Sequence, residues 1–314
     1  MVDFSIFGDY QNPVEFNFST AEGFSSQLRW TSQRINIFYA RTPRVESIAA
    51  REFRGFFATV FAQNMQVCSA DAEALSEALT AAADIVDYLT EQARLENERR
   101  QKVRDFAAQH DDFSDHVRDF FTGVDVPPNL TPAEPPPPQL LRLPLTRQRQ
   151  QDRSIRGSSG GISAADPKDL ISAAQVLGEA AAQVPSGSVL AGWFDDFTSQ
   201  CKYGTVEVGD LFVQLDRWRG LNDGDVEWLH AVAKAFQAAG SGVITLPNSA
   251  LRAALRAAGT PLWRTDLDIT SPGLSGIDPR TGYLEDPINS ATGNFIEPET
   301  DPVSYTHLRA HETR

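Results

Sequence analysis

A long apolar stripe between Leu75 and Ala93 constrains the fold more than any other feature of the sequence. Its residues recur at spacings of four and three, which places them on one face of an α-helix, and acidic residues such as Glu77 and Asp84 flank them. The stripe consists of Leu75, Leu79, Ala82, Val86, Leu89 and Ala93. One face of this helix must therefore be buried against other helices.

A shorter helix is predicted upstream, from about Thr20 to Tyr39, and Pro43 is expected to end it. Its apolar residues have compatible spacing: Phe24, Leu28, Ile35 and Phe38. The two helices predict an antiparallel hairpin with unequal arms, contained in a domain of residues 1–121. The fold class is expected to be mainly α.

Residues 122–165 differ sharply in composition. Eight prolines lie between Pro127 and Pro144, and a segment rich in Arg, Gln, Gly and Ser follows from Arg147 to Gly161. Such a composition buries too little apolar surface to offset the entropy of ordering it, so the sequence predicts a Pro-rich linker followed by a flexible tether.

A second small helical domain is predicted for residues 166–260, with Asp166 opening one helix, Asp223 opening another and Gly240 ending it. The loops around Gly204 and Gly242 have the spacing of an EF-hand pair, but few oxygen ligands for calcium precede either glycine. This pattern resembles a ligandless EF-hand pair, in which Val206 and Ile244 would lie side by side in a two-stranded ladder.

The net charge of the chain limits the kinds of partner that it can bind. The formal net charge is -14 and the sequence pI is near 4.8, which argues against affinity for nucleic acid or for an anionic membrane surface. No apolar run approaches the roughly 18 residues that span a bilayer, and the start lacks the pattern of a signal peptide. We expect no membrane span and no nucleic-acid partner.

Few residues in the sequence suggest a catalytic or metal-binding role. His110 and His116 are six positions apart, which places them on different sides of a helix, and His230 lies in an amphipathic segment typical of packing. Cys68 and Cys201 fit neither a zinc site nor a disulfide framework. No nucleophile elbow, phosphate-binding loop or metalloprotease motif occurs. The expectation is a protein that is not an enzyme, with no catalytic residues, no metal site and no cofactor.

The last part of the sequence has two sections. Residues 261–301 predict a short segment of loops and strands that cannot form a domain alone. Residues 302–314 are expected to be artificial, because VSYTHLRAHET, from Val303 to Thr313, matches the translation of a transposon-end sequencing adapter. The natural reading frame is therefore expected to be interrupted near Asp301.

The hairpin resembles the WXG100 superfamily of small helical hairpins exported by type VII secretion. Phe53-Arg54-Gly55 corresponds to the Trp-x-Gly of that family at the hairpin turn. The resemblance implies partner-binding residues on the apolar face: Phe53, Gly55, Phe61, Leu75, Leu79, Val86 and Leu89. The family's export signal is a Tyr followed four residues later by an acid, but Tyr88 is followed by Gln92. Export would then use a partner's signal or a degenerate one.

A second resemblance concerns Asp286 to Phe295, DPINSATGNF, which looks like the opening of the Rhs/YD-repeat region of actinobacterial polymorphic toxins. The residues that carry this resemblance are Asp286, Pro287, Thr292, Gly293 and Phe295. It implies a large β-shell downstream in the same chain, enclosing a variable toxin domain.

Together these features predict a non-catalytic export and assembly region of a secreted Rhs-type toxin, truncated before its shell. Its expected partners are a WXG100-like helical hairpin or the secretion machinery, and the downstream shell in cis. It would be cytoplasmic before export and then secreted or surface-bound without a classical signal peptide. Three alternatives remain: a cell-surface or phage-associated structural protein, an apolar stripe that packs against residues 166–260 and binds no partner, and a hydrolase or metal enzyme in that second block.

Overall fold

The computed structural model describes residues 7–110, 130, 132, 135–141 and 161–267. The described part is mainly helical, as predicted, with a few short strands. Its elements are, in chain order, α1 (Phe18–Tyr39), α2 (Thr42–Ala49), β1 (Arg54–Gly55), α3 (Phe56–His110), β2 (Gln139–Leu140), β3 (Ile162–Ala165), α4 (Pro167–Ala181), α5 (Gly187–Gln200), β4 (Val206–Glu207), α6 (Leu211–Ala239), β5 (Ile244–Pro247) and α7 (Asn248–Ala257).

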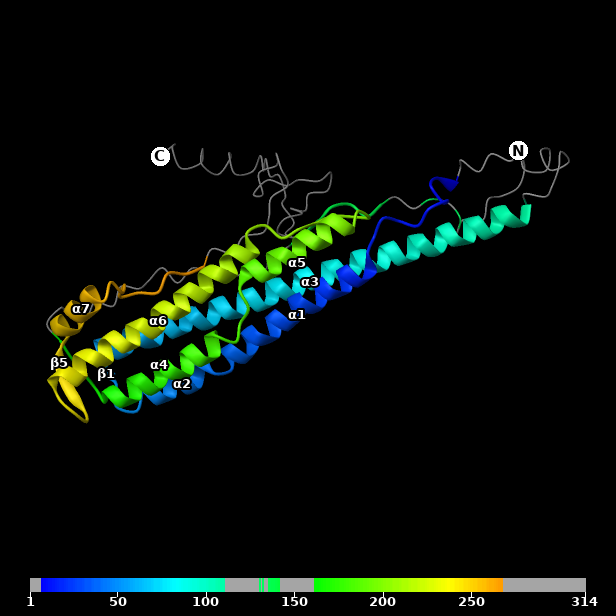
Figure 1. Cartoon of the computed structure of the whole chain (residues 1–314). Helices are drawn as coiled ribbons and strands as arrows, with labels where there is room; N and C mark the ends of the chain where they lie inside the picture. Colours follow the sequence, from blue (N-terminus) through cyan, green and yellow to red (C-terminus); the bar gives the residue numbers. More distant parts are fainter. Residues whose placement is uncertain (1–6, 111–129, 131, 133–134, 142–160, 268–314) are drawn as a thin grey trace, which may run out of the picture.

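The first and third helices form the antiparallel pair that the sequence predicts. Ser25 of α1 donates a hydrogen bond to Asp87 of α3 at 2.5 Å, and Ser32, two turns later in α1, donates to the carbonyl of Ser76 at 3.0 Å. Later residues of α1 therefore contact earlier residues of α3, as expected for an antiparallel pair. Figure 1 shows α3 running beyond the start of α1, so the arms are unequal.

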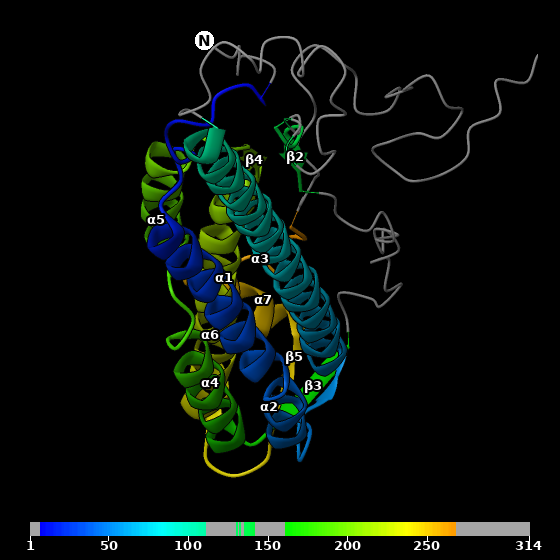
Figure 2. The same cartoon turned by 90° about the vertical axis from the view of Figure 1, so that its right-hand side faces the viewer.

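The apolar stripe of α3 is covered by helices of the same chain. The stripe residues are buried in one cluster with residues of α1 and α6, both of which pack against α3. Before the stripe, Trp228 of α6 packs on Phe53, Phe57 and Phe61, with ring centroids 6.1 to 6.4 Å apart. On the α1 side, Phe38 lies 4.8 Å from the ring of Trp218. Figure 2 shows α6 behind α1 and α3, with α4 and α5 to the left.

This arrangement corrects two expectations. A single hydrophobic cluster joins buried residues of both predicted helical domains, so residues 1–121 and 166–260 do not have separate cores. The predicted partner-binding side chains are also no more than 5% exposed, namely Phe53, Phe61, Leu75, Leu79, Val86 and Leu89. Helical periodicity identifies the face to be buried but not what covers it, and here α1 and α6 of the same chain pack against α3.

A three-stranded antiparallel sheet closes one end of the bundle, in the order β1-β3-β5. Its central strand consists of residues 162–165, so the last four residues of the predicted linker are structured. Gly55 has a φ of +90°, and a Cβ there would lie 2.4 Å from the carbonyl oxygen of Ile162. Only glycine fits this turn between α2 and α3 without strain.

The EF-hand resemblance led to a wrong strand pairing. Val206 pairs with Gln139 in a parallel β2–β4 ladder, whereas Ile244 pairs with Ala165 in the other sheet. Helix α6 also passes without a break through Asp223, which was expected to begin a helix. Asp166 does cap α4, accepting a hydrogen bond from the Lys168 amide at 2.9 Å, and α6 ends at Gly240.

Candidate functional site

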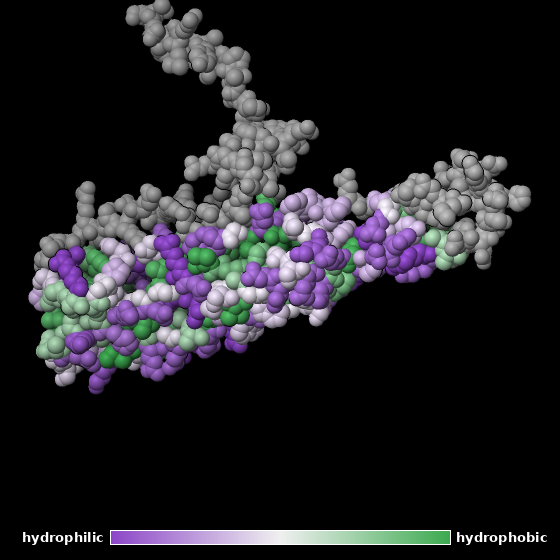
Figure 3. Space-filling model, turned by 45° about the horizontal axis from the view of Figure 1, so that its top comes forward, coloured by the Kyte–Doolittle hydropathy of each residue, from purple (hydrophilic) through white to green (hydrophobic). Residues whose placement is uncertain are grey.

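Four segments that are distant in the sequence meet where α3 extends beyond α1. They are the N-terminal residues 7–16, the second half of α3, the described Pro-rich residues 130, 132 and 135–141, and the loop 201–208 that follows α5. Figure 1 shows this end of the molecule beside the start of α1. In Figure 3, hydrophilic residues predominate on the surface towards this end.

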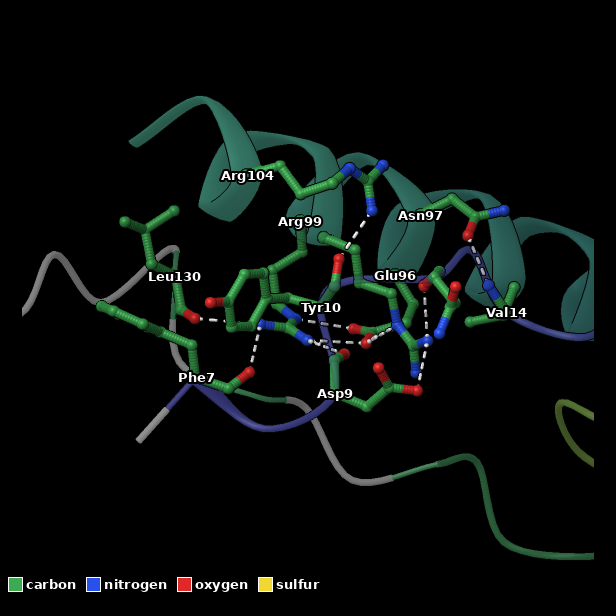
Figure 4. Close-up of polar contacts among 11 residues, drawn as sticks. Phe7, Asp9, Tyr10, Val14, Glu96, Asn97, Arg99, Arg104 and Leu130 are labelled. Atoms are coloured by element: carbon green, nitrogen blue, oxygen red, sulfur yellow. Dashed lines mark hydrogen bonds and ion pairs between the residues drawn. The ribbon is translucent and has the colours of Figure 1, made fainter. Parts of the chain in front are cut away.

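Arg99 of α3 lies at the centre of the site (Figure 4). Its guanidinium forms a two-point ion pair with Glu96, with Nε and Nη2 each 2.8 Å from a carboxylate oxygen. Its Nη1 donates to the carbonyls of Phe7 at 3.1 Å and Leu130 at 3.0 Å. One buried side chain thus joins the N-terminal segment, α3 and the Pro-rich segment, with the planar donor geometry for which arginine is suited.

Arg104 and Asn97 extend this polar contact along residues 10–14 (Figure 4). Arg104 donates to the carbonyl of Tyr10 at 2.6 Å, and the side chain of Asn97 accepts from the Val14 amide at 2.8 Å. Arg100 donates to Glu96 at 2.8 Å as well. The N-terminal segment, which has little regular structure of its own, is therefore bound mainly through its backbone.

The two arginines control the ionisation of Glu96. Burial alone would raise the pKa of its carboxyl group, but hydrogen bonds from Arg99 and Arg100 outweigh burial and hold that pKa below its ordinary value.

A small apolar cluster completes the contact: Phe7, Val103 and Leu130 are buried together, and the rings of Phe7 and Phe106 lie 6.1 Å apart.

The loop after α5 contacts both the N-terminal segment and α3. Lys202 donates its amide to the carbonyl of Glu15 at 2.7 Å, and Phe16 forms an isolated antiparallel bridge with Cys201. Gly204 packs so closely that a Cβ there would lie 2.7 Å from the side chain of Leu89. Burial, reinforced by the charge of Glu96, raises the pKa of the Tyr203 hydroxyl.

The Pro-rich segment is bound against the same loop. The amide of Gln139 donates to the carbonyl of Thr205 at 2.8 Å, and the amide of Leu141 donates to the carbonyl of Glu207 at 3.0 Å. The side chain of Leu141 is fully buried in the main core. Part of the predicted linker is therefore packed on the bundle, and residues 142–160 lie outside the described part of the chain.

A shallow groove of about 410 Å³ lies between the N-terminal segment and α3. It is lined by Pro13, Phe18, Arg94, Asn97, Glu98, Gln101 and Arg104. Arg94 is 5.6 Å from the ring centre of Phe18 and forms an ion pair with Glu22 at 3.3 Å. The arginines that line the groove already have intramolecular partners, so the groove alone does not indicate a ligand.

The residues singled out in the sequence lie mostly elsewhere. The apolar partner-binding residues are in the core, with Leu89 alone reaching this site through Gly204, and His230 is exposed on α6. Cys68 and Cys201 are both buried, and burial raises the pKa of the Cys68 thiol to about 12. His116 and the predicted Rhs residues from Asp286 to Phe295 lie outside the described residues.

Sequence reasoning missed Glu96 and Arg99. Their three-residue spacing on a helix predicts an ion pair, but such pairs are normally exposed and contribute little. What distinguishes this pair is burial by the N-terminal and Pro-rich segments, which carry no periodic pattern. No sequence signal indicated that these segments would return to α3.

Neither a metal-binding cluster nor a membrane-spanning helix occurs among the described residues. No group of three or more His, Cys, Asp or Glu side chains that could hold a metal ion occurs there. No helix in these ranges combines the length and hydrophobicity needed to cross a bilayer. Comparison of the chain with protein-family models, curated proteins and solved structures found no match.

We expect Glu96→Gln to weaken the fold most near neutral pH. The folded-state pKa of Glu96 is lowered, so its ion pair stabilises the protein above the unfolded-state pKa, and this stabilisation is lost as pH falls through the lowered value. The free energy of unfolding in urea should fall by about 2 to 3 kcal/mol at pH 7, the range for hydrogen bonds to charged groups. The difference between variant and wild type should shrink towards pH 3.

Glu98→Gln is the matched control, because Glu98 lies on the exposed side of the same turn of α3. Its free energy of unfolding should follow that of the wild type at every pH. Equal losses for the two variants at pH 7 would contradict the role assigned to Glu96.

Proposed function

We propose that this chain is a non-catalytic export and assembly unit of the type VII secretion kind, in which α4 to α6 take in cis the place of a partner hairpin. The observation that carries the proposal is the covered stripe of α3. Two helices alone leave part of such a stripe exposed, and a second pair of helices is the usual way to bury it. Trp218 of α6 packs on Phe38 of α1, and Trp228 of α6 packs on Phe61 of α3, which supports the proposal that α6 stands in for a partner helix.

The proposal also supplies the export signal that α3 lacks. Of the six tyrosines in the sequence, only Tyr203 is followed four residues later by an acid, Glu207. Because Tyr88 is followed by Gln92, the resemblance implies a signal contributed by a partner or a degenerate one. Tyr203 and Glu207 belong to the block that covers the stripe in place of a partner.

The geometry of the loop suits recognition by another protein. Val206 and Val208 point into the core, at 4% exposure each, whereas Thr205 and Glu207 are exposed. Tyr203 is half-buried beside α3. The β2–β4 ladder keeps this stretch extended, so the side chains of Tyr203 and Glu207 are presented on a fixed backbone.

The assembly part of the proposal concerns the chain after α7. The Rhs-like segment from Asp286 to Phe295 would lead into a β-shell downstream, for which the helical bundle would serve as the head during export. In this proposal the chain is cytoplasmic first and then secreted or bound to the cell surface. The acidic net charge of -14 supports a soluble route over adsorption to an anionic membrane.

A secretion assay tests the proposal. The tagged chain is expressed in a bacterium that has a type VII system and in an isogenic strain without the secretion ATPase, and the culture medium and cells are compared. We expect the wild type in the medium of the first strain only. Tyr203→Ala and Glu207→Gln should each keep most of the chain inside the cells, while circular dichroism shows an unchanged helical content.

Tyr88→Ala is the matched control, since Tyr88 is an exposed tyrosine on nearby α3 that is not followed by an acid. It should be exported like the wild type. Export that does not depend on the ATPase, or normal export of Tyr203→Ala, would refute the proposal. Retention of the chain at the cell surface without the system would favour a structural surface protein instead.

A further inference from the structure

Residues 260–267, which follow α7, form an extended segment bound by side chains of other elements. The amide of Arg264 donates to Oδ1 of Asn64 at 3.0 Å, and Nδ2 of Asn64 donates to the carbonyl of Leu262 at 3.2 Å. The amide of Leu267 donates to Oδ1 of Asp71 at 3.4 Å. Two side chains of α3 thus take the hydrogen-bonding role that a neighbouring strand has in a sheet.

Arg264 is the deepest side chain of this segment and is fully buried. Its guanidinium donates to Asp225 of α6, and its Nε lies 3.7 Å from a carboxylate oxygen of Asp71 of α3. The side chain of Asp225 is itself only 8% exposed. Because an unpaired buried charge is very costly, these two acids define a pocket in which a guanidinium is strongly preferred.

Apolar side chains of the same segment bind on either side of this pocket. Leu267 is 4% exposed and belongs to the main core, and Leu262 and Trp263 pack against that core while remaining half-buried. The segment therefore packs against α3 and α6 in the way that an extended peptide ligand packs in a groove. Asn64 and Asp71 bind its backbone, and Asp71 and Asp225 bind its arginine. Its leucines pack against the hydrophobic core.

The connection to α7 is not part of these contacts. Helix α7 ends at Ala257, and Ala258 and Gly259 are exposed, with Gly259 at a φ of +70°. The groove contacts begin only beyond this turn. The turn is bound to α7 by the amides of Gly259 and Thr260, which donate to the carbonyls of Arg256 and Leu255, whereas the side chains of Asn64, Asp71 and Asp225 contact residues after the turn.

We propose that the groove between α3 and α6 is a peptide-binding site for an extended segment with the pattern Leu-x-Arg-x-x-Leu, and that residues 262–267 are its intramolecular occupant. The site binds the chain after α7 to the helical bundle independently of the covalent connection. Cleavage of the exposed turn at Gly259 then leaves the two pieces associated. The pocket formed by Asp71 and Asp225 gives the site its selectivity for arginine.

The test uses the full chain with a site-specific protease sequence inserted between Ala258 and Gly259. After cleavage, the smaller piece should co-elute with the larger one in size-exclusion chromatography, and circular dichroism should show unchanged helical content. A synthetic peptide of residues 259–267, added in excess, should release the smaller piece. The control peptide has citrulline at the position of Arg264, which keeps the shape but removes the charge.

The citrulline peptide should compete at least about 100-fold more weakly, because it leaves the two buried carboxylates without a cation. Separation of the cleaved pieces without competitor, with or without loss of helix, would overturn the proposal. Equal competition by the two peptides would overturn the assignment of the arginine pocket. Neither result depends on whether the chain is exported.

Discussion

A Leu79→Asp variant is expected to unfold the whole described bundle, and not only to lose a partner. Leu79 is fully buried in α3 and belongs to the cluster shared with α4 and α6. The substitution loses about 2 to 3 kcal/mol of apolar burial and buries a carboxylate that has no cation beside it, which costs several kcal/mol more. The sum approaches the whole stability of a typical domain, about 5 to 15 kcal/mol.

The matched control is Leu95→Asp in the same helix, because Leu95 is 49% exposed. Circular dichroism and urea unfolding should show little helix for the Leu79 variant and a transition close to wild type for the Leu95 variant. A folded Leu79→Asp protein would mean that Leu79 is not buried in the shared cluster in solution. In that case the stripe would again be the surface for a separate hairpin partner.

Replacing Arg264 with alanine is expected to lower the free energy of unfolding by about 3 to 5 kcal/mol, the range for breaking a buried ion pair on one side. The loss is large because Asp71 and Asp225 stay buried after their cation is removed. Arg256→Ala is the matched control, since Arg256 is exposed in the last turn of α7. Urea unfolding should give a change of less than about 1 kcal/mol for that control, as for an ordinary surface residue.

The loss in the Arg264 variant should also depend on pH. Burial raises the pKa of Asp225 to about 6, and Arg264 opposes that shift, so removing the arginine raises this pKa further. A carboxyl group whose folded-state pKa lies above its unfolded-state value stabilises the fold as pH falls through the folded-state value. The difference between Arg264→Ala and wild type should therefore be smaller at pH 5 than at pH 7. A difference that grows on acidification would contradict this account.

A double-mutant cycle separates the ion pair from general packing. Asp225→Asn combined with Arg264→Met should cost less than the sum of the two single changes, because Arg264→Met alone leaves both acids without their cation, whereas the double variant leaves only Asp71. Additive losses would indicate that Asp225 and Arg264 contribute independently. The cycle also tests whether the acid of α6 is the main partner of the arginine.

Local sequence signals predicted most of the helices and some of their ends. The stripe from Leu75 to Ala93 lies in α3, and Asp166 and Gly240 lie at helix ends, because capping and periodicity act over a few residues. Asp223 was misleading, since an acid that suits a helix start also fits the exposed side of a continuous helix. The residues from Asp286 to Phe295 stay a sequence prediction.

The sequence by itself determined that α1 and α3 are amphipathic, that their apolar faces must be buried and that Gly55 can form a turn. Only the tertiary structure decided that α4 to α6 bury those faces, that Arg264 is placed between Asp71 and Asp225, and that Glu96 and Arg99 bind the N-terminal segment. The physical reason is that the hydrophobic effect does not depend on where in the sequence the covering residues lie. The spacing of apolar residues shows which face of a helix must be buried. Which elements bury that face depends on competition among all the apolar faces that the folded chain can bring together.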